Sequence, residues 1–176
     1  MPYKVIGMLH NGGLMKDTNS GVAIVYFNAQ ERAKYEIVAN NGFLCSVRGG
    51  VLDTGTSSNK AFIFVMTAEG KIYSGDKSQV KHHSAFMSGR PVAAAGTWTV
   101  ENGVPVNISG ESGHYQPTSD YLKQFISELK SRNVNLKKAA IKYGKSSKEI
   151  GRLMLARGMK QNMRLYTPER PRHEWF

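Results

Sequence analysis

Two short segments of the chain combine histidines with residue types that bind small ligands. The segment "KHHSAFMSGR" contains His82 and His83, and "ESGHYQP" contains His114 and Tyr115 in a Ser-Gly turn. An imidazole titrates near neutral pH and can act as an acid, a base or a ligand. Binding residues also concentrate in loops held by a rigid scaffold. The two segments therefore predict one shared pocket, with packing or turn-forming roles for the same residues as the alternative.

Charged residues near these segments suit a nucleotide. Arg90 follows Gly89, and a guanidinium can hold a diphosphate through two parallel hydrogen bonds. Glu111 lies three residues before His114, where a carboxylate can orient an imidazole or hold a ribose. The surrounding glycines form neither a GxGxxG nor a Walker pattern, so they identify no nucleotide by themselves.

A metal centre is not expected. The HxH, HxxxH and HExxH spacings that direct two histidines to one ion are missing from the sequence. The single cysteine, Cys45, excludes an intrachain disulfide and a multi-cysteine zinc site. Cys45 also lies in an apolar segment without a neighbouring charge that would stabilise a thiolate nucleophile.

The elements that must position these residues begin with β-hairpins. Three pairs of apolar runs are each joined by a glycine-containing turn: "AKYEIVANNGFLCSV", "KAFIFVMTAEGKIYSG" and "AAAGTWTVENGVPVNI". Near the N-terminus, "KVIGML" and "VAIVYF" also have the composition of short strands. The pattern predicts a largely antiparallel sheet.

The hydrophobic period changes to that of a helix after residue 117. One apolar face is expected from the i, i+3, i+4 and i+7 positions Leu122, Phe125, Ile126 and Leu129. A second helix is expected in "SSKEIGRLMLARG", because Ser146 and Glu149 have the spacing of a capping box. The predicted fold class is α+β, with an antiparallel β-rich core followed by two basic C-terminal helices.

The charge of the chain is concentrated near its C-terminus. Residues 1–118 carry 10 Lys and Arg against 8 Asp and Glu, whereas residues 119–176 carry 14 against 5. We therefore expect a β-rich catalytic or binding domain at 1–136 and a basic helical extension with a tail at 137–176. The positive electrostatic field of the C-terminal segment would attract nucleic acid, phosphorylated ligands or acidic proteins.

The segment "LKKAAIKYGKSSKEIGRLM" has the small, turn and apolar spacing of a helix-turn-helix. Such a motif would present its second helix to a DNA groove. Docking of nucleic acid or another target is accordingly assigned to Lys145, Lys148, Arg152 and Arg157.

Between about residues 31 and 136, four segments occur in order: "ERAKYEIV", "KAFIFVMTAEGKIY", "HHSAFMSGRPVAAAG" and "SGHYQPTSDYLKQFISEL". This stretch resembles the conserved region of the plant IQ-motif calmodulin-binding proteins of the IQM type. It is also similar to fungal and bacterial domains, some of them toxin-like or effector-like. The resemblance carries onto the family pattern His83, Ser84, Phe86, Gly89, Ala95, Gly96, Ser112, Gly113, His114 and Tyr115. Because no IQ motif precedes the region, calmodulin is not expected as a partner.

The leading functional hypothesis is a toxin-like or effector-like enzyme that transfers ADP-ribose from NAD to a macromolecular target. His83 or His114 would hold the nicotinamide ribose, and Tyr115 would stack on the ring. Glu111 would stabilise the oxocarbenium ion, and Arg90 would clamp the diphosphate. The cofactor-binding set would be Arg90, Ser84, Gly89 and Tyr115.

Two alternatives remain open. A metal-free ribonuclease toxin would use His83 and His114 as base and acid, with Arg90 or Lys81 on the phosphate. A non-catalytic nucleic-acid-binding or protein-binding module would rely on the helix-turn-helix-like C-terminus.

The expected partners are an acidic protein or nucleic acid, without a membrane, and a toxin would also have a cognate immunity protein. The N-terminus lacks the pattern of a classical signal peptide. The expected site of action is the cytoplasm, reached through a dedicated secretion system if the protein is a bacterial export.

Overall fold

The computed structural model describes residues 2–8, 24–55, 61–113 and 115–156. Its strands are β1 (Glu36–Asn40), β2 (Phe43–Ser46), β3 (Phe62–Met66), β4 (Ile72–Asp76), β5 (Ala94–Glu101), β6 (Val104–Ser109) and β7 (Ala140–Lys142). Its helices are α1 (Ala29–Ala33), the 3-10 helix η1 (His83–Ala85), α2 (Ser119–Ser131) and α3 (Ser147–Ala156). Within the described ranges, no helix combines the length and apolar character needed to cross a membrane.

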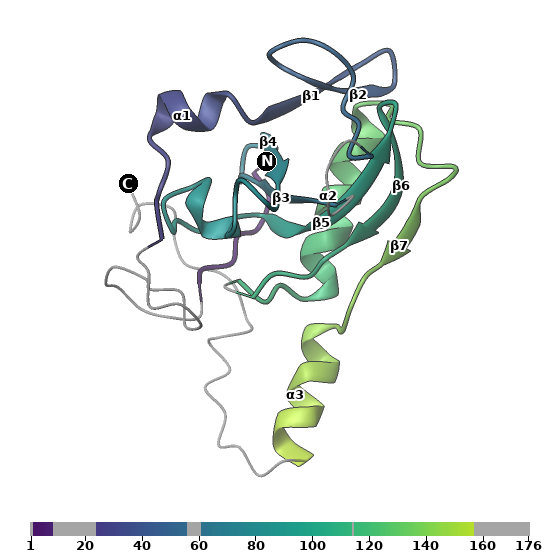
Figure 1. Ribbon diagram of the computed structural model, residues 1–176. Helices are drawn as coiled ribbons and strands as arrows, with labels where there is room; N and C mark the ends of the chain where they lie inside the picture. Colours follow the sequence, from purple (N-terminus) through teal and green to yellow (C-terminus); the bar gives the residue numbers. More distant parts are fainter. Residues whose placement is uncertain (1, 9–23, 56–60, 114, 157–176) are drawn as a thin grey trace.

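The strands form one sheet in the order β2-β1-β4-β3-β5-β6-β7, with α2 packed along one face (Figure 1). Every neighbouring pair is antiparallel except β6 and β7, which run parallel. The expected α+β class with a mainly antiparallel β-rich core is thus confirmed.

The three predicted hairpins are present as β1–β2, β3–β4 and β5–β6. Asn41 and Gly42 have φ values of 51° and 83°, and Asn102 and Gly103 have 47° and 79°. Positive φ at both central residues is the requirement of a type I′ turn, which matches the twist of the flanking strands. The Asn-Gly pairs therefore explain why the first and third hairpins could be located from sequence.

The two strands expected near the N-terminus are not strands in the described residues. Ile6 forms only an isolated bridge with Val92, through backbone hydrogen bonds of 2.8 and 3.0 Å. The bridge cannot extend, because Ala93 already donates its N–H to Met66 and the chain enters β5 at the next residue. Residues 24–27 carry no strand assignment, and residues 9–23 lie outside the described ranges.

The predicted apolar face of α2 is confirmed: Leu122, Phe125, Ile126 and Leu129 are buried against the sheet. The ring of Phe125 stacks on Phe64 of β3, with centroids 4.0 Å apart and planes at 8°. Aromatic contacts of this kind add to the stabilisation from buried area. The helix itself is not basic, because its two lysines are balanced by one aspartate and one glutamate.

Close packing at this interface depends on Gly96 in β5. A Cβ atom at Gly96 would lie 2.0 Å from the carbonyl oxygen of Ser109 and 2.8 Å from Cζ of Phe64. Real Cβ atoms essentially never approach other atoms so closely. The position therefore requires glycine if Phe64 is to reach Phe125.

The opposite face of the sheet carries a second apolar cluster, in which β3 and β5 residues pack against the η1 region and Tyr115. Tyr115 is 0% exposed, and its hydroxyl donates to the carbonyl of Arg90 at 2.8 Å. Burial raises the pKa of Tyr115 well above that of a free phenol. The ring therefore contributes to the core.

A parallel strand follows the long loop after α2. The register of β7 on β6 pairs Ala140 with Asn107 and Ile141 with Ile108, and Ile141 packs against the α2-side core. The expected helix-turn-helix is wrong, because residues 140–142 of that segment form strand β7. They pair with the edge of β6 and are not helical. The domain boundary at residue 136 stays a prediction.

We expect Gly96→Ala to lower the free energy of unfolding by about 2 kcal/mol or more, because the new methyl group overlaps backbone and ring atoms. Urea denaturation followed by tryptophan fluorescence measures the loss. Gly7→Ala is the control, since no atom lies within 4 Å of its Cβ position. Equal stability of the two variants would contradict the packing argument.

We expect Tyr115→Phe to lower the free energy of unfolding by about 1 kcal/mol, because the Arg90 carbonyl loses its hydrogen bond. The matched control is Tyr143→Phe, in which the tyrosine is 37% exposed. It should change stability by less than about 0.5 kcal/mol. A stability loss of the same size in both variants would show that the buried hydrogen bond is unimportant.

Candidate functional site

A tight turn after β4 carries the chain towards η1. The carboxylate of Asp76 accepts a hydrogen bond from Ser78 N at 2.8 Å, and its carbonyl accepts one from Val80 N at 2.8 Å. Beyond this turn His83 is 9% exposed, with its Nε2 atom 2.7 Å from the carbonyl oxygen of Gly96. Because a carbonyl oxygen can only accept, Nε2 carries the proton and the orientation of the ring is fixed.

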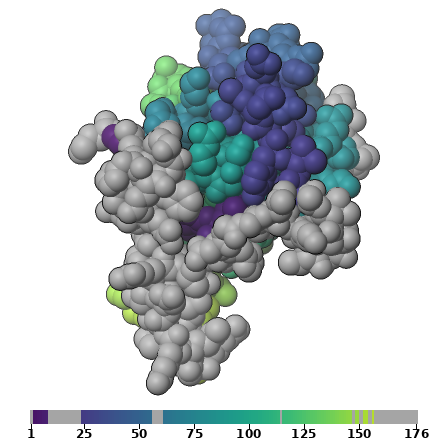
Figure 2. All heavy atoms as spheres, turned by 90° about the vertical axis from the view of Figure 1, so that its left-hand side faces the viewer, coloured from purple at the N-terminus to yellow at the C-terminus, as the bar shows by residue number. Residues whose placement is uncertain are grey.

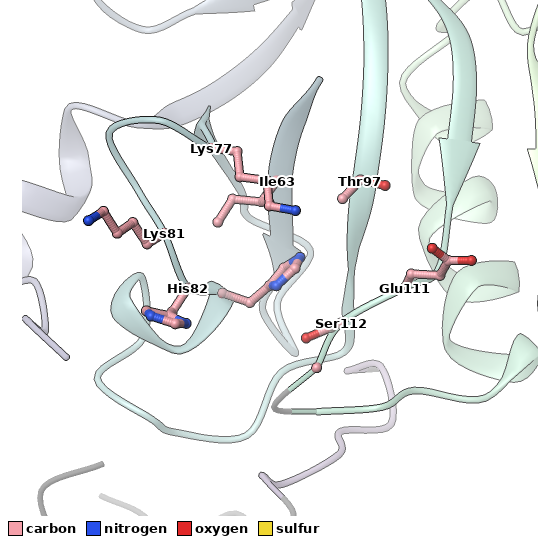
Figure 3. Close-up of a pocket in the computed structure, with 9 residues that line it drawn as sticks. Ile63, Lys77, Lys81, His82, Thr97, Glu111 and Ser112 are labelled. Atoms are coloured by element: carbon pink, nitrogen blue, oxygen red, sulfur yellow. The ribbon is translucent and has the colours of Figure 1, made fainter. Parts of the chain in front are cut away.

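A pocket of about 270 Å³ lies beside His83, on the face of the sheet opposite α2. Strands β3 and β5 form its floor, where Ile63 and Thr97 are directly paired. The loop after β4 and the loop after β6 form its walls (Figure 3). The lining residues are Ile63, Lys77, Lys81, His82, His83, Thr97, Glu111, Ser112 and Gly113.

The charges around the pocket are mainly positive. Lys77 and Lys81 lie on one wall, and Figure 3 shows Lys77 extending over Ile63 while Lys81 points away from the floor. The carboxylate of Glu111 on the opposite wall lies 2.7 Å from Nζ of Lys142. This hydrogen bond, together with the attraction of the two charges, raises the pKa of Lys142. Two lysines therefore line the pocket, and the carboxylate of Glu111 is paired with a third lysine. This balance of charges suits an anion.

The structure brings together part of the predicted site. His83 and Glu111 line the same pocket, which brings parts of the two histidine-containing segments together. The neighbouring His82 and Ser112 also contribute. His114 lies outside the described residues, and its expected role stays a prediction.

Other predicted site residues lie elsewhere among the described residues. Tyr115 is in the second core cluster, and Ser84 is 0% exposed within η1. Gly89 has φ 74°, and a Cβ there would meet Met8 and Tyr26. The Nε atom of Arg90 donates to the carbonyl of Met87 at 3.0 Å. None of these residues lines the pocket, and their assignment to NAD stays a prediction.

Sequence reasoning missed three lining residues, Ile63, Lys77 and Thr97. Lys77 follows β4 directly, in a turn with no motif of its own. Thr97 shares a sheet face with Ala95, two positions before it, because side chains alternate along a strand. A polar threonine on the same strand face as a buried alanine was the available signal that this face borders a polar pocket.

The predicted docking residues lie on the segment after residue 136. Lys145, Lys148 and Arg152 are exposed, the last two on α3. Arg157 lies outside the described residues. Their docking role stays a prediction.

Comparison with known proteins identifies the region that contains the pocket. The family model of the IQ motif-containing protein middle domain matches residues 31–122. IQ domain-containing protein IQM3 of Arabidopsis thaliana is 41% identical over 117 residues, which cover 64% of this chain and 25% of the relative. The Arabidopsis protein IQM1 is 38% identical over 114 residues, covering 64% and 23%. The chain thus spans about a quarter of the length of these relatives, and no solved structure matches it.

These matches correct the functional hypotheses. The relatives are named for an IQ motif, so the expectation of a secreted bacterial toxin or effector with ADP-ribosyltransferase or ribonuclease activity is wrong. The partner expectation is also wrong, because it rejected calmodulin whereas an IQ-motif family points to partners of the calmodulin type. The match covers both histidine-containing segments and strands β1 to β6. The chain therefore belongs to the family of IQ motif-containing proteins and contains its middle domain.

Proposed function

We propose that the protein is a non-enzymatic binding protein, in which the segment 137–156, here called the basic extension, docks onto a calmodulin-type partner. The observation that carries the proposal is the exposure of Lys148, Arg152 and Leu153 on α3, a basic amphipathic helix at the end of the described residues. Figures 1 and 2 show α3, in yellow-green, at one end of the molecule, away from α1 and β1.

The start of α3 is stabilised locally. Ser146 N donates to Glu149 Oε2 at 2.7 Å, and Glu149 N donates to Ser146 Oγ at 3.2 Å. These reciprocal bonds form the expected capping box, and they lower the pKa of Glu149. Just before the helix, the carbonyl of Lys145 accepts a hydrogen bond from Ser119 N at 3.0 Å. The helix is therefore anchored at its first turn, and Lys148, Arg152 and Leu153 beyond the cap are exposed.

The two sides of α3 differ in chemistry. Helical spacing places positions 150, 153 and 154, all apolar, on one face and Lys148 with Arg152 on the other. Leu153, on the apolar face, is 40% exposed and accessible to a partner. Calmodulin binds amphipathic helices by enclosing their apolar face in a hydrophobic groove. A basic amphipathic helix is the type of target it accepts.

The charge of the basic extension adds long-range attraction. It contains six Lys and Arg residues and one glutamate. EF-hand proteins concentrate carboxylates in their calcium-binding loops. The positive field of the basic extension and the negative field of such a partner would accelerate their encounter and fix their relative orientation.

We expect purified protein to bind calmodulin in isothermal titration calorimetry, performed once with calcium and once with a calcium chelator. The double variant Lys148→Glu and Arg152→Glu should weaken binding by about tenfold or more, because like charges then face the partner. The control variant, Lys34→Glu and Lys71→Glu, makes the same change in net charge at exposed positions outside the basic extension.

The control should keep most of the affinity if α3 is the docking element. Equal weakening by both double variants would assign the interaction to net charge alone. Absence of binding in both calcium conditions would overturn the proposed function.

A further inference from the structure

We propose that the pocket beside His83 is a binding site for a small phosphorylated molecule. The site lies on the sheet face opposite α2, and its chemistry does not depend on docking at α3. Failure of one proposal therefore leaves the other standing.

The first argument is charge. Lys77 and Lys81 line the pocket, and both are exposed at its rim. The carboxylate Glu111 is held by Lys142 at 2.7 Å. Lysine is a common ligand of phosphate and acts as a point charge. A ligand with two negative charges would thus enter a site that is positive before it arrives.

The second argument is the number of hydroxyl donors. Ser112 is 8% exposed, and its Oγ atom accepts a hydrogen bond from Tyr115 N at 3.4 Å, which leaves the hydroxyl proton for another acceptor. The hydroxyl of Thr97 on the floor makes no side-chain hydrogen bond to another described residue. The pocket therefore offers two hydroxyl groups, on Thr97 and Ser112, that can donate to a ligand.

The third argument is shape. Residues able to donate lie on three sides of the pocket: Lys77 on the loop after β4, Thr97 on the floor and Ser112 on the loop after β6 (Figure 3). A phosphoryl group has oxygens in a tetrahedral arrangement and uses donors from several sides, whereas a carboxylate is planar. The volume of about 270 Å³ lies just below the range of about 300–1,000 Å³ for drug-sized ligands. It suits a phosphoryl group with a small organic substituent.

The test is a titration of the full chain, labelled with ¹⁵N, in which amide chemical shifts are followed by NMR. The probes are ribose 5-phosphate, inorganic phosphate and unphosphorylated ribose. We expect saturable shifts at residues 81–84 and 111–113 with the phosphorylated probe and none with ribose. Tighter binding of ribose 5-phosphate than of inorganic phosphate would identify an organic phosphate as ligand, and equal affinity would identify the free anion.

Variants of the pocket locate the interaction. Lys77→Met should weaken binding by about tenfold, since a hydrogen bond to a charged group is lost. Thr97→Val keeps the branched side chain and removes the hydroxyl, with an expected weakening of about fivefold. Lys71→Met removes the same charge from an exposed position that does not line the pocket, and it should bind as the wild type does.

Three results would overturn the proposal: no saturable shift with either phosphorylated probe, shifts of the same size with ribose, or equal weakening by Lys71→Met and Lys77→Met. Because Lys77 is exposed and Thr97→Val keeps the shape of the side chain, both variants should fold. Spectra outside the pocket that match the wild type verify this.

Discussion

The missing side chain of Gly96 is the constraint on which the two faces of the sheet depend. On one face, the edge of Phe64 occupies the space that a Cβ atom would take, which brings its ring onto Phe125 and fixes α2. The carbonyl of the same glycine accepts the hydrogen bond of His83. One residue thus couples the packing of the main core to the position of the loop that forms the pocket.

Local chemistry was sufficient to predict most of the fold. The Asn-Gly pairs of two hairpins require positive φ, so their positions follow directly from residue type. The apolar spacing of α2 and the capping box at Ser146 are equally local. In contrast, β7 has only three residues, and its pairing with β6 joins segments more than thirty residues apart. A short strand of this kind has no periodicity that could distinguish it from a helix or a loop.

The site was predicted in part, for a similar reason. His83 and Glu111 could be recognised because histidines and carboxylates in loops are informative residue types. Tyr115 was misleading, since an aromatic ring with a hydroxyl suits a ligand and a core equally well. Here the Arg90 carbonyl satisfies that hydroxyl, which lets the ring be buried. Lys77 could not be assigned to the site from sequence, because only the folded path of the chain places it beside the pocket.

The position of β7 has a consequence for the behaviour of the protein in solution. It is an outer strand of the sheet, and the outer edge of such a strand offers backbone groups to which another chain can add. Short length and flanking lysines are the usual protection against such growth. β7 has both, with Lys138 before it and Lys142 as its last residue. The lysines that make this end of the molecule basic therefore also keep separate copies from joining edge to edge.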